Sequence, residues 1–190
     1  MSGVLLVIGA GGHGRSVAEA VLLSGDYRLA GFVDDDWEKL RDVWGYPVFG
    51  GTDSLASQLG HADLAIVAIG NNVVRERLHG QLRELGFGLA TVVHPRGIVS
   101  SRASLGAGCA VMAGAIVGTE ALLGEGVIVN CGATVDHHCT VEDFGHLGVN
   151  ACMAGGSTLG RGAWLQAGSA LGYGVKVPPA AVLKPGEARG

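Results

Sequence analysis

The sequence predicts an α/β domain with a half-Rossmann-like parallel sheet over residues 1–95, followed by a parallel β-helix over residues 96–190. Three observations support this. Strand-like and helix-like segments alternate through the first half, which is typical of a parallel α/β domain. From Ile98 onward an aliphatic residue recurs at every sixth position. Glycine makes up 34 of 190 residues while 48% of residues are hydrophobic, which indicates tight turns in a folded chain rather than polar disorder.

The repeat is continuous from Ile98 to Glu187. A period of six fits neither a helix nor a two-residue alternation, but it does fit a short strand, a turn and another short strand. Three such blocks close one triangular coil, and coils stack through parallel β hydrogen bonds. The segment therefore predicts five coils, with the first half capping one end and the last block the other. The second place of every block is aliphatic: Val99, Leu105, Val111, Val117, Leu123, Val129, Val135, Val141, Leu147, Met153, Leu159, Leu165, Leu171, Val177 and Leu183.

The elements of the first half follow from apolar runs and their flanking residues. Strands are expected at 4–8, 28–33, 47–49, 62–69 and 89–93, and helices at 15–23, 54–59 and 73–85. Asp53 is expected to cap the second helix. His94 and Pro95 mark the join to the β-helix.

A glycine-rich turn follows the first strand. Gly9, Gly11 and Gly14 satisfy G-x-G-x-x-G, and Asp34 follows at the end of the second strand. Such a turn lets the backbone approach a pyrophosphate at a helix N-terminus, and the aspartate can hold a ribose or base. NAD is the usual ligand. Because residues 1–95 make only half a dinucleotide fold, a nucleotide-sugar fits better, and an NAD-binding regulator stays as an alternative.

Charge and hydropathy exclude several classes of protein. The net charge of −4 gives no indication of nucleic acid or an anionic membrane as a partner. No run of about 18 apolar residues predicts a membrane span, and the N-terminus lacks the basic leader of a signal peptide. The four cysteines lack CxxC spacing and are expected to be reduced and buried. We therefore expect a cytoplasmic protein.

Five segments carry a family resemblance: VIGAGGHG, FVDDD, VAIGNNVVRERL, VVHP and DHHCTVEDFGH. With them the chain resembles the bacterial sugar acetyltransferases of the PglD/NeuD type, in the hexapeptide-repeat superfamily, over essentially its full length. The resemblance implies a left-handed β-helix and a homotrimer. It also implies a first domain that binds a nucleotide-sugar, and acetyl-CoA lying along the β-helix between subunits.

The resemblance also implies site residues. His137 matches the family's general base, while His138 stands where the family has an acidic neighbour, a place that Asp136 or Glu142 could fill instead. His146 matches a second catalytic histidine, close to the thioester carbonyl. The nucleotide-sugar would contact Gly11, Gly12, His13, Asp34 and Asp35, and acetyl-CoA would contact His146, Ala167 and Pro185.

The resulting mechanism is direct acetyl transfer. His137 takes a proton from the acceptor as it attacks acetyl-CoA, and His146 or a backbone N–H stabilises the oxyanion. N-acetylation of a 4-amino nucleotide-sugar is favoured, with O-acetylation of a sialic-acid-type sugar second. Trp164 lies three blocks after His146 and should stack on it one coil away.

Two other classes of function stay open. Three closely spaced histidines, all expected to project outward, are also consistent with zinc shared between subunits, as in carbonic-anhydrase-like β-helices. A non-catalytic nucleotide-sugar sensor is the other. The favoured hypothesis needs no metal.

Overall fold

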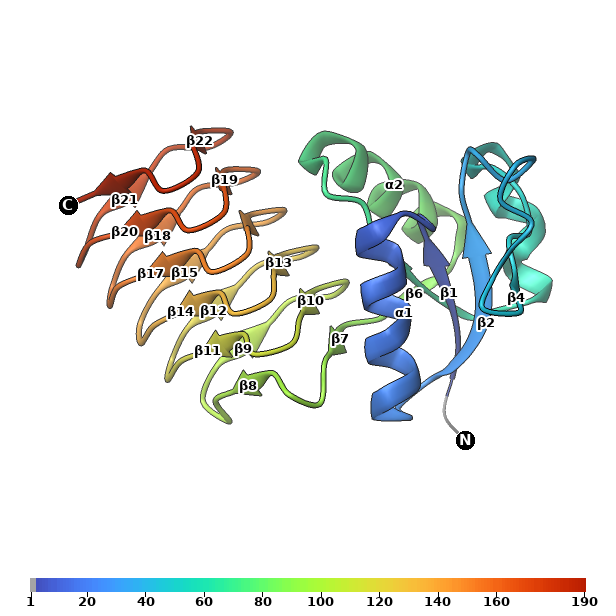
Figure 1. Ribbon diagram of the computed structural model, residues 1–190, viewed down its shortest axis with the longest axis horizontal. Helices are drawn as coiled ribbons and strands as arrows, with labels where there is room; N and C mark the ends of the chain where they lie inside the picture. The colour runs from blue at the N-terminus through green and yellow to red at the C-terminus, as the bar shows by residue number, and fades with distance from the viewer. Residues whose placement is uncertain (1–2) are drawn as a thin grey trace.

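The computed structural model describes residues 3–190 and has two parts lying side by side (Figure 1). The first part is built on a four-stranded parallel sheet in the order β2-β1-β5-β6. Its strand β1 is buried because it lies between β2 and β5 and consists of apolar residues alone. The strands are β1 (Val4–Ile8), β2 (Arg28–Val33), β5 (Leu64–Val67) and β6 (Gly88–Leu89).

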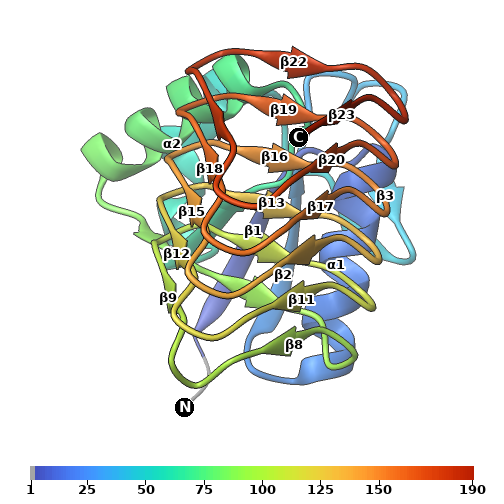
Figure 2. The same cartoon turned by 90° about the vertical axis from the view of Figure 1, so that its left-hand side faces the viewer.

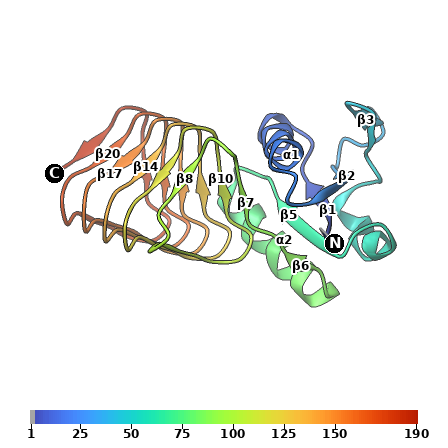
Figure 3. The ribbon, with the colours of Figure 1, turned by 90° about the horizontal axis from the view of Figure 1, so that it is seen from below.

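Helices cover both faces of this sheet (Figure 3). Helix α1 (Gly12–Ser24) packs Val17 and Val21 against one face, and α2 (Asn72–Leu85) packs Leu78 and Leu82 against the other. A 3₁₀ helix, η1 (Thr52–Gly60), lies with α2, and β3 (Asp42–Val43) and β4 (Tyr46–Pro47) form a small hairpin. The alternation of strands and helices predicted from sequence is confirmed. The prediction that Asp53 caps a helix is wrong, because η1 begins after Gly51 without a side-chain cap.

The second part is a parallel β-solenoid of three sheets, seen as stacked coils in Figure 2. Each strand is short and pairs with the strands of the coils before and after it, as Ile116 pairs with Ile98 and with Thr134. The β7 sheet holds β7 (Val92–Val93), β10 (Ala110–Val111), β13 (Ile128–Val129), β16 (His146–Leu147), β19 (Trp164–Leu165) and β22 (Val182–Leu183). The β8 sheet holds β8 (Ile98–Val99), β11 (Ile116–Val117), β14 (Thr134–Val135), β17 (Cys152–Met153), β20 (Ala170–Leu171) and β23 (Ala188–Arg189). The β9 sheet holds β9 (Ser104–Leu105), β12 (Leu122–Leu123), β15 (Thr140–Val141), β18 (Thr158–Leu159) and β21 (Lys176–Val177).

The second-place aliphatic residues form the solenoid core, as the repeat predicts. All are buried except Val99 and Leu105, which are partly buried in the first coil. About five coils are present, as expected. The strand predicted at 89–93 is divided, because Gly88–Leu89 closes the α/β sheet while Val92–Val93 pairs with β10 in the solenoid. The division at residue 95 stays a prediction, and the first solenoid strand precedes it.

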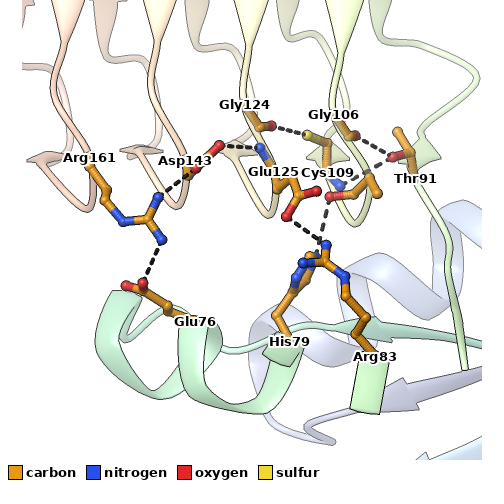
Figure 4. A network of polar contacts seen from close by, with 11 residues as sticks. Glu76, His79, Arg83, Thr91, Gly106, Cys109, Gly124, Glu125, Asp143 and Arg161 are labelled. Atoms are coloured by element: carbon orange, nitrogen blue, oxygen red, sulfur yellow. Dashed lines mark hydrogen bonds and ion pairs between the residues drawn. The ribbon is translucent and has the colours of Figure 1, made fainter. Parts of the chain in front are cut away.

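The α/β domain lies against the side of the solenoid and does not cap its end, contrary to expectation (Figures 1 and 2). Helix α2 runs across successive turns that lead from the β9 sheet to the β7 sheet (Figure 4). Ion pairs join Glu76 to Arg161 at 2.6 Å and Arg83 to Glu125 at 2.7 Å. Exposed pairs of this kind stabilise little, so the buried Arg75 between them is the main polar link.

Within residues 3–190, no helix is long and apolar enough to cross a membrane. All four cysteines are free, as expected, but Cys131 is only partly buried and Cys152 is exposed.

Candidate functional site

The glycine turn presents backbone N–H groups at the start of α1. Gly11 is the N-cap and no side chain caps the helix, so the first N–H groups are free to meet a ligand. A Cβ on Gly11 or Gly12 would meet nothing within 4 Å, whereas a Cβ on Gly14 would collide with the carbonyl oxygen of Gly9. The first two glycines therefore open the site, and Gly14 lets the helix approach the strand.

A cavity of about 340 Å³ begins at this turn, within the usual size range for small-molecule sites. It lies at the carboxyl ends of β1, β2 and β5, where open α/β sheets bind ligands. All five residues predicted to bind the nucleotide-sugar line it. The lining residues are Gly9, Gly11, Gly12, His13, Val33, Asp34, Asp35, Thr52, Ala68, Ile69 and Gly70.

The two aspartates also hold the walls of the cavity. Asp34 accepts hydrogen bonds from the backbone N–H of Ala10 at 2.7 Å and of Asp36 at 2.9 Å. Asp35 accepts one from the N–H of Thr52 at 2.7 Å. Because both oxygens of Asp34 already accept a backbone bond, this carboxylate fixes the shape of the glycine turn in addition to facing the ligand.

The solenoid approaches the cavity at His146. The Nδ1 atom of His146 lies 3.2 Å from the carbonyl oxygen of Gly70, a cavity residue. Its ring stacks on Trp164 with centroids 5.2 Å apart, which confirms the predicted one-coil spacing. The Nε2 atom of His13 is buried and, among residues 3–190, has no hydrogen-bond partner. The aromatic stack therefore lies next to Gly70, at the edge of the cavity, without lining it.

Burial keeps both histidines uncharged at neutral pH. Desolvation, followed by the charge of Arg75, lowers the pKa of His13 to about 4 and that of His146 to about 3. A neutral His146 must use its one N–H at Nδ1 to reach the Gly70 carbonyl, which leaves Nε2 with a lone pair. In this geometry His146 is suited to accept a hydrogen bond from a substrate rather than to donate one to an oxyanion.

His137 and His138 lie elsewhere on the solenoid. We call the turns 118–120, 136–138 and 154–156, which lead from the β8 sheet to the β9 sheet, the histidine corner. His137 and His138 are half-exposed there, with their Nδ1 atoms 2.9 Å apart. His146 lies on β16 in the β7 sheet, so the structure does not bring the three histidines of one chain together as an outward-facing group.

Sequence reasoning missed Glu120, which lies 2.8 Å from the Nε2 atom of His138. The signal was present, because the corner residues of successive coils stack and Glu120 holds the place of His138 one coil earlier. Of the two carboxylates suggested by the sequence, Asp136 lies beside His137 at this corner, whereas Glu142 lies elsewhere. Asp136 is 3.7 Å from the Nε2 atom of His137, and Glu142 accepts the backbone N–H of Arg161.

Ala167 and Pro185, the expected acetyl-CoA contacts, are exposed at the third corner of the prism, between the β7 and β8 sheets. They stack one coil apart, and the N–H of Gly186 donates to the carbonyl of Ala167 at 2.9 Å. Neither lies at the histidine corner of its own chain. Residues 3–190 contain no group of three or more His, Cys, Asp or Glu side chains placed to hold a metal ion.

Known proteins share this arrangement. Residues 4–82 match the family model of the PglD N-terminal domain. The chain is 33% identical over 113 residues to UDP-N-acetylbacillosamine N-acetyltransferase of Bacillus subtilis, a match that covers 56% of this chain and 50% of that relative. The chain thus spans about half the length of that curated relative.

Solved structures match over almost the whole chain. One is a histidine-to-alanine variant of GDP-perosamine N-acetyl transferase from Caulobacter crescentus in complex with CoA and GDP-perosamine, with a TM-score of 0.94 and 34% identity over 100% of this chain and 89% of that one. Another is the acetyltransferase domain of PglB from Neisseria gonorrhoeae with acetyl coenzyme A, with a TM-score of 0.91 and 36% identity over 98% and 90% of the two chains. The chain therefore belongs to the PglD/NeuD family of bacterial sugar acetyltransferases.

Proposed function

We propose that the protein transfers an acetyl group from acetyl-CoA to the amino group of a nucleotide-linked amino sugar. The observation that carries this proposal is the end-to-end match to a transferase solved with CoA and GDP-perosamine. The Bacillus subtilis relative and the Caulobacter crescentus enzyme are both named for N-acetyl transfer, which favours an amine acceptor over a hydroxyl acceptor.

The acceptor would bind in the cavity of the α/β domain. The free N–H groups of Gly11 and Gly12 and the helix dipole suit a diphosphate. His13, Asp34 and Asp35 would contact the rest of the nucleotide-sugar. An acceptor amine reaching the solenoid from this cavity would meet the lone pair on the Nε2 atom of His146.

The chemistry would need a base, which we assign to His137. Its Nε2 atom takes the proton of the amine as the nitrogen attacks the thioester carbonyl, and coenzyme A then leaves as the thiol or thiolate. A backbone N–H would stabilise the tetrahedral oxyanion. Ala167 and Pro185 would contact acetyl-CoA along the exposed corner of the solenoid.

The proposal includes a homotrimer, because the acceptor cavity and the base His137 lie far apart within a single chain although both must contact the reacting groups. The cavity lies beside the β7 sheet, whereas His137 lies at the corner between the other two sheets. The β8 sheet next to that corner presents exposed Ile98 and Ile116. A second copy covering this face would bring His137 of one subunit towards the cavity of its neighbour, with acetyl-CoA between them. We include a cytoplasmic location because the acetyl donor is an intracellular metabolite.

The test is release of free CoA thiol from acetyl-CoA with GDP-perosamine, a UDP-linked 4-amino sugar, a CMP-linked sialic acid or NADH as the second ligand. We expect turnover with an amino sugar. Turnover only with the sialic-acid-type sugar would establish O-acetylation instead. Binding without turnover would indicate a sensor, and stoichiometric zinc in the purified protein without transfer would favour the carbonic-anhydrase-like alternative.

A further inference from the structure

A chain of three side chains crosses the histidine corner. Glu120 Oε2 lies 2.8 Å from His138 Nε2, and His138 Nδ1 lies 2.9 Å from His137 Nδ1. We propose that Glu120 and His138 are positioning residues that fix His137 in the tautomer with a free Nε2 atom. This inference rests on the proposed function only for the role of His137 as the base.

The order of donors follows from the carboxylate at one end. An ionised Glu120 can only accept, so His138 must donate from Nε2. A neutral His138 then has a lone pair at Nδ1, which accepts the Nδ1–H of His137. The remaining nitrogen of His137, Nε2, is left unprotonated. An unprotonated Nε2 is what a general base needs. Glu120, one coil away, therefore holds the His137 proton on Nδ1 through His138, as an adjacent acidic residue would do directly.

The backbone at this corner supports the assignment. Glu120 and His138 both have positive φ, +59° and +58°, a conformation that most solenoid corners give to glycine. The next two residues of the same column, Gly156 and Gly174, are glycines with φ of +71° and +68°. The chain therefore keeps side chains in an unfavourable conformation at the two positions that contact one another.

The next coil leaves room for the base. A Cβ on Gly155, which holds the place of His137 one coil later, would collide with the Cε1 atom of the His137 ring. Since the φ of Gly155 is not positive, its backbone conformation does not require glycine, and a side chain there would instead displace the His137 ring from this position.

The titratable groups in contact with His137 and His138 are Asp136 and Glu120. Asp136 lies 3.7 Å from His137 Nε2, on the side where the proton arrives. It can stabilise the imidazolium formed during transfer, but at this distance it makes no hydrogen bond and so does not hold a proton on Nε2. Glu120 is the carboxylate that reaches the opposite nitrogen through His138.

The first experiment compares Glu120→Gln and His138→Ala with the wild-type protein in acetyl transfer. We expect kcat to fall about 10-fold or more with unchanged KM for acetyl-CoA, as part of the roughly 100-fold to 10,000-fold that general-base catalysis supplies. The acidic limb of the pH–rate profile should move in Glu120→Gln, because the base loses its carboxylate. Glu142→Gln is the matched control, because it makes the same substitution at a carboxylate that contacts neither His137 nor His138. It should leave kcat and the pH–rate profile unchanged.

A second experiment replaces the indirect link through His138 with a carboxylate placed directly beside His137. Glutamate is already accommodated at the equivalent corner position, Glu120, so His138→Glu places an acid directly beside His137. In the His138→Glu background, Glu120→Gln should no longer reduce kcat, and the double variant should recover most of the wild-type rate. An equal loss on Glu120→Gln in both backgrounds would overturn the proposal.

A third measurement does not depend on turnover. ¹⁵N NMR of histidine-labelled protein at pH 8 distinguishes a protonated from an unprotonated ring nitrogen, and we expect His137 to carry its proton at Nδ1 in the wild type. Glu120→Gln should give a mixture of tautomers. If no acceptor is acetylated, the proposed function fails and this spectrum still decides the positioning role. A His137 protonated at Nε2, or a spectrum unaffected by Glu120→Gln, would contradict it.

Discussion

The guanidinium of Arg75 donates to the carbonyl of Phe144 at 2.8 Å, which places a charge from α2 inside the seam between the two domains. Arg75 is fully buried, and it also donates to the carbonyls of Gly126, Ile69 and Gly70 and to the amide oxygen of Asn72. Burial lowers its pKa to about 10, so it stays charged at neutral pH. One side chain thus ties the rim of the nucleotide cavity to two coils of the solenoid.

Replacing Arg75 should therefore destabilise the protein. Arg75→Met leaves several buried carbonyls without donors, and we expect a loss of about 2–4 kcal/mol in the free energy of unfolding, measured by guanidinium denaturation. Arg83→Met removes an exposed ion pair with Glu125 and should lose at most about 1 kcal/mol. Equal losses in the free energy of unfolding would show that the buried hydrogen bonds of Arg75 stabilise the protein no more than the exposed ion pair of Arg83 does.

Gly14→Ala should abolish nucleotide-sugar binding. The added Cβ collides with the backbone of Gly9, so α1 must move away from β1 and the glycine turn loses its shape. Thermal shift with GDP-perosamine measures the loss, since a bound ligand raises the melting temperature. Gly80→Ala is the control, because it lies within α2 with nothing within 4 Å of its Cβ and should stabilise by about 0.5–1 kcal/mol. Ligand binding retained in Gly14→Ala would contradict the assigned role of the turn.

The repeat could be predicted from sequence because one physical requirement recurs at every second place. Each of those side chains must fill the same narrow prism, so the pattern at Val111 is repeated at Leu183 without interruption. The lateral packing of the α/β domain could not be predicted, because it depends on Arg75 and on backbone carbonyls such as that of Gly126. Backbone acceptors carry no sequence signal.

The site was only partly predictable for a related reason. The cavity residues were found because glycine spacing reports directly on backbone geometry. The sequence did not predict that His137 and His146 have different environments, since the chain crosses from one corner to a different sheet between them. The contact of Glu120 with His138 follows from the coil period, because the two residues hold the same place in successive coils. It joins residues that are distant in sequence, so the residues next to His138 in the chain do not reveal it.

His137→Ala should reduce acetyl transfer by roughly 100-fold to 10,000-fold while leaving the fold intact. The side chain is half-exposed, so its removal creates no core cavity. Steady-state kinetics and the melting temperature together check this. His61→Asn, beside Phe49 in the α/β domain, is the control and should keep full activity. A His137→Ala enzyme with wild-type kcat would show that another group is the base.

Ile116→Glu should prevent assembly. Ile116 is 40% exposed on the β8 sheet, and a carboxylate buried there by a second copy would be left without a partner. Light scattering coupled to gel filtration should show a trimer for the wild type and a monomer for the variant. Val73→Glu, exposed on α2, should remain trimeric. A wild-type monomer, or an Ile116→Glu trimer, would refute the proposed arrangement.

Stability should fall as the pH is lowered below neutral. The pKa of His13 is about 4 and that of His146 about 3 in the folded chain, both depressed from 6.5. Between pH 6.5 and those values the unfolded chain binds more protons than the folded one, so each histidine should lower the free energy of unfolding by about 1.4 kcal/mol per pH unit. This contribution is fully present above pH 6.5 and is lost as the pH falls towards 4 and 3. Denaturation curves at pH 7.5, 6 and 5 measure the slope, and His146→Asn should make it shallower by about one proton because the substituted side chain does not titrate. An identical slope in this variant would mean that His146 is not held neutral by burial.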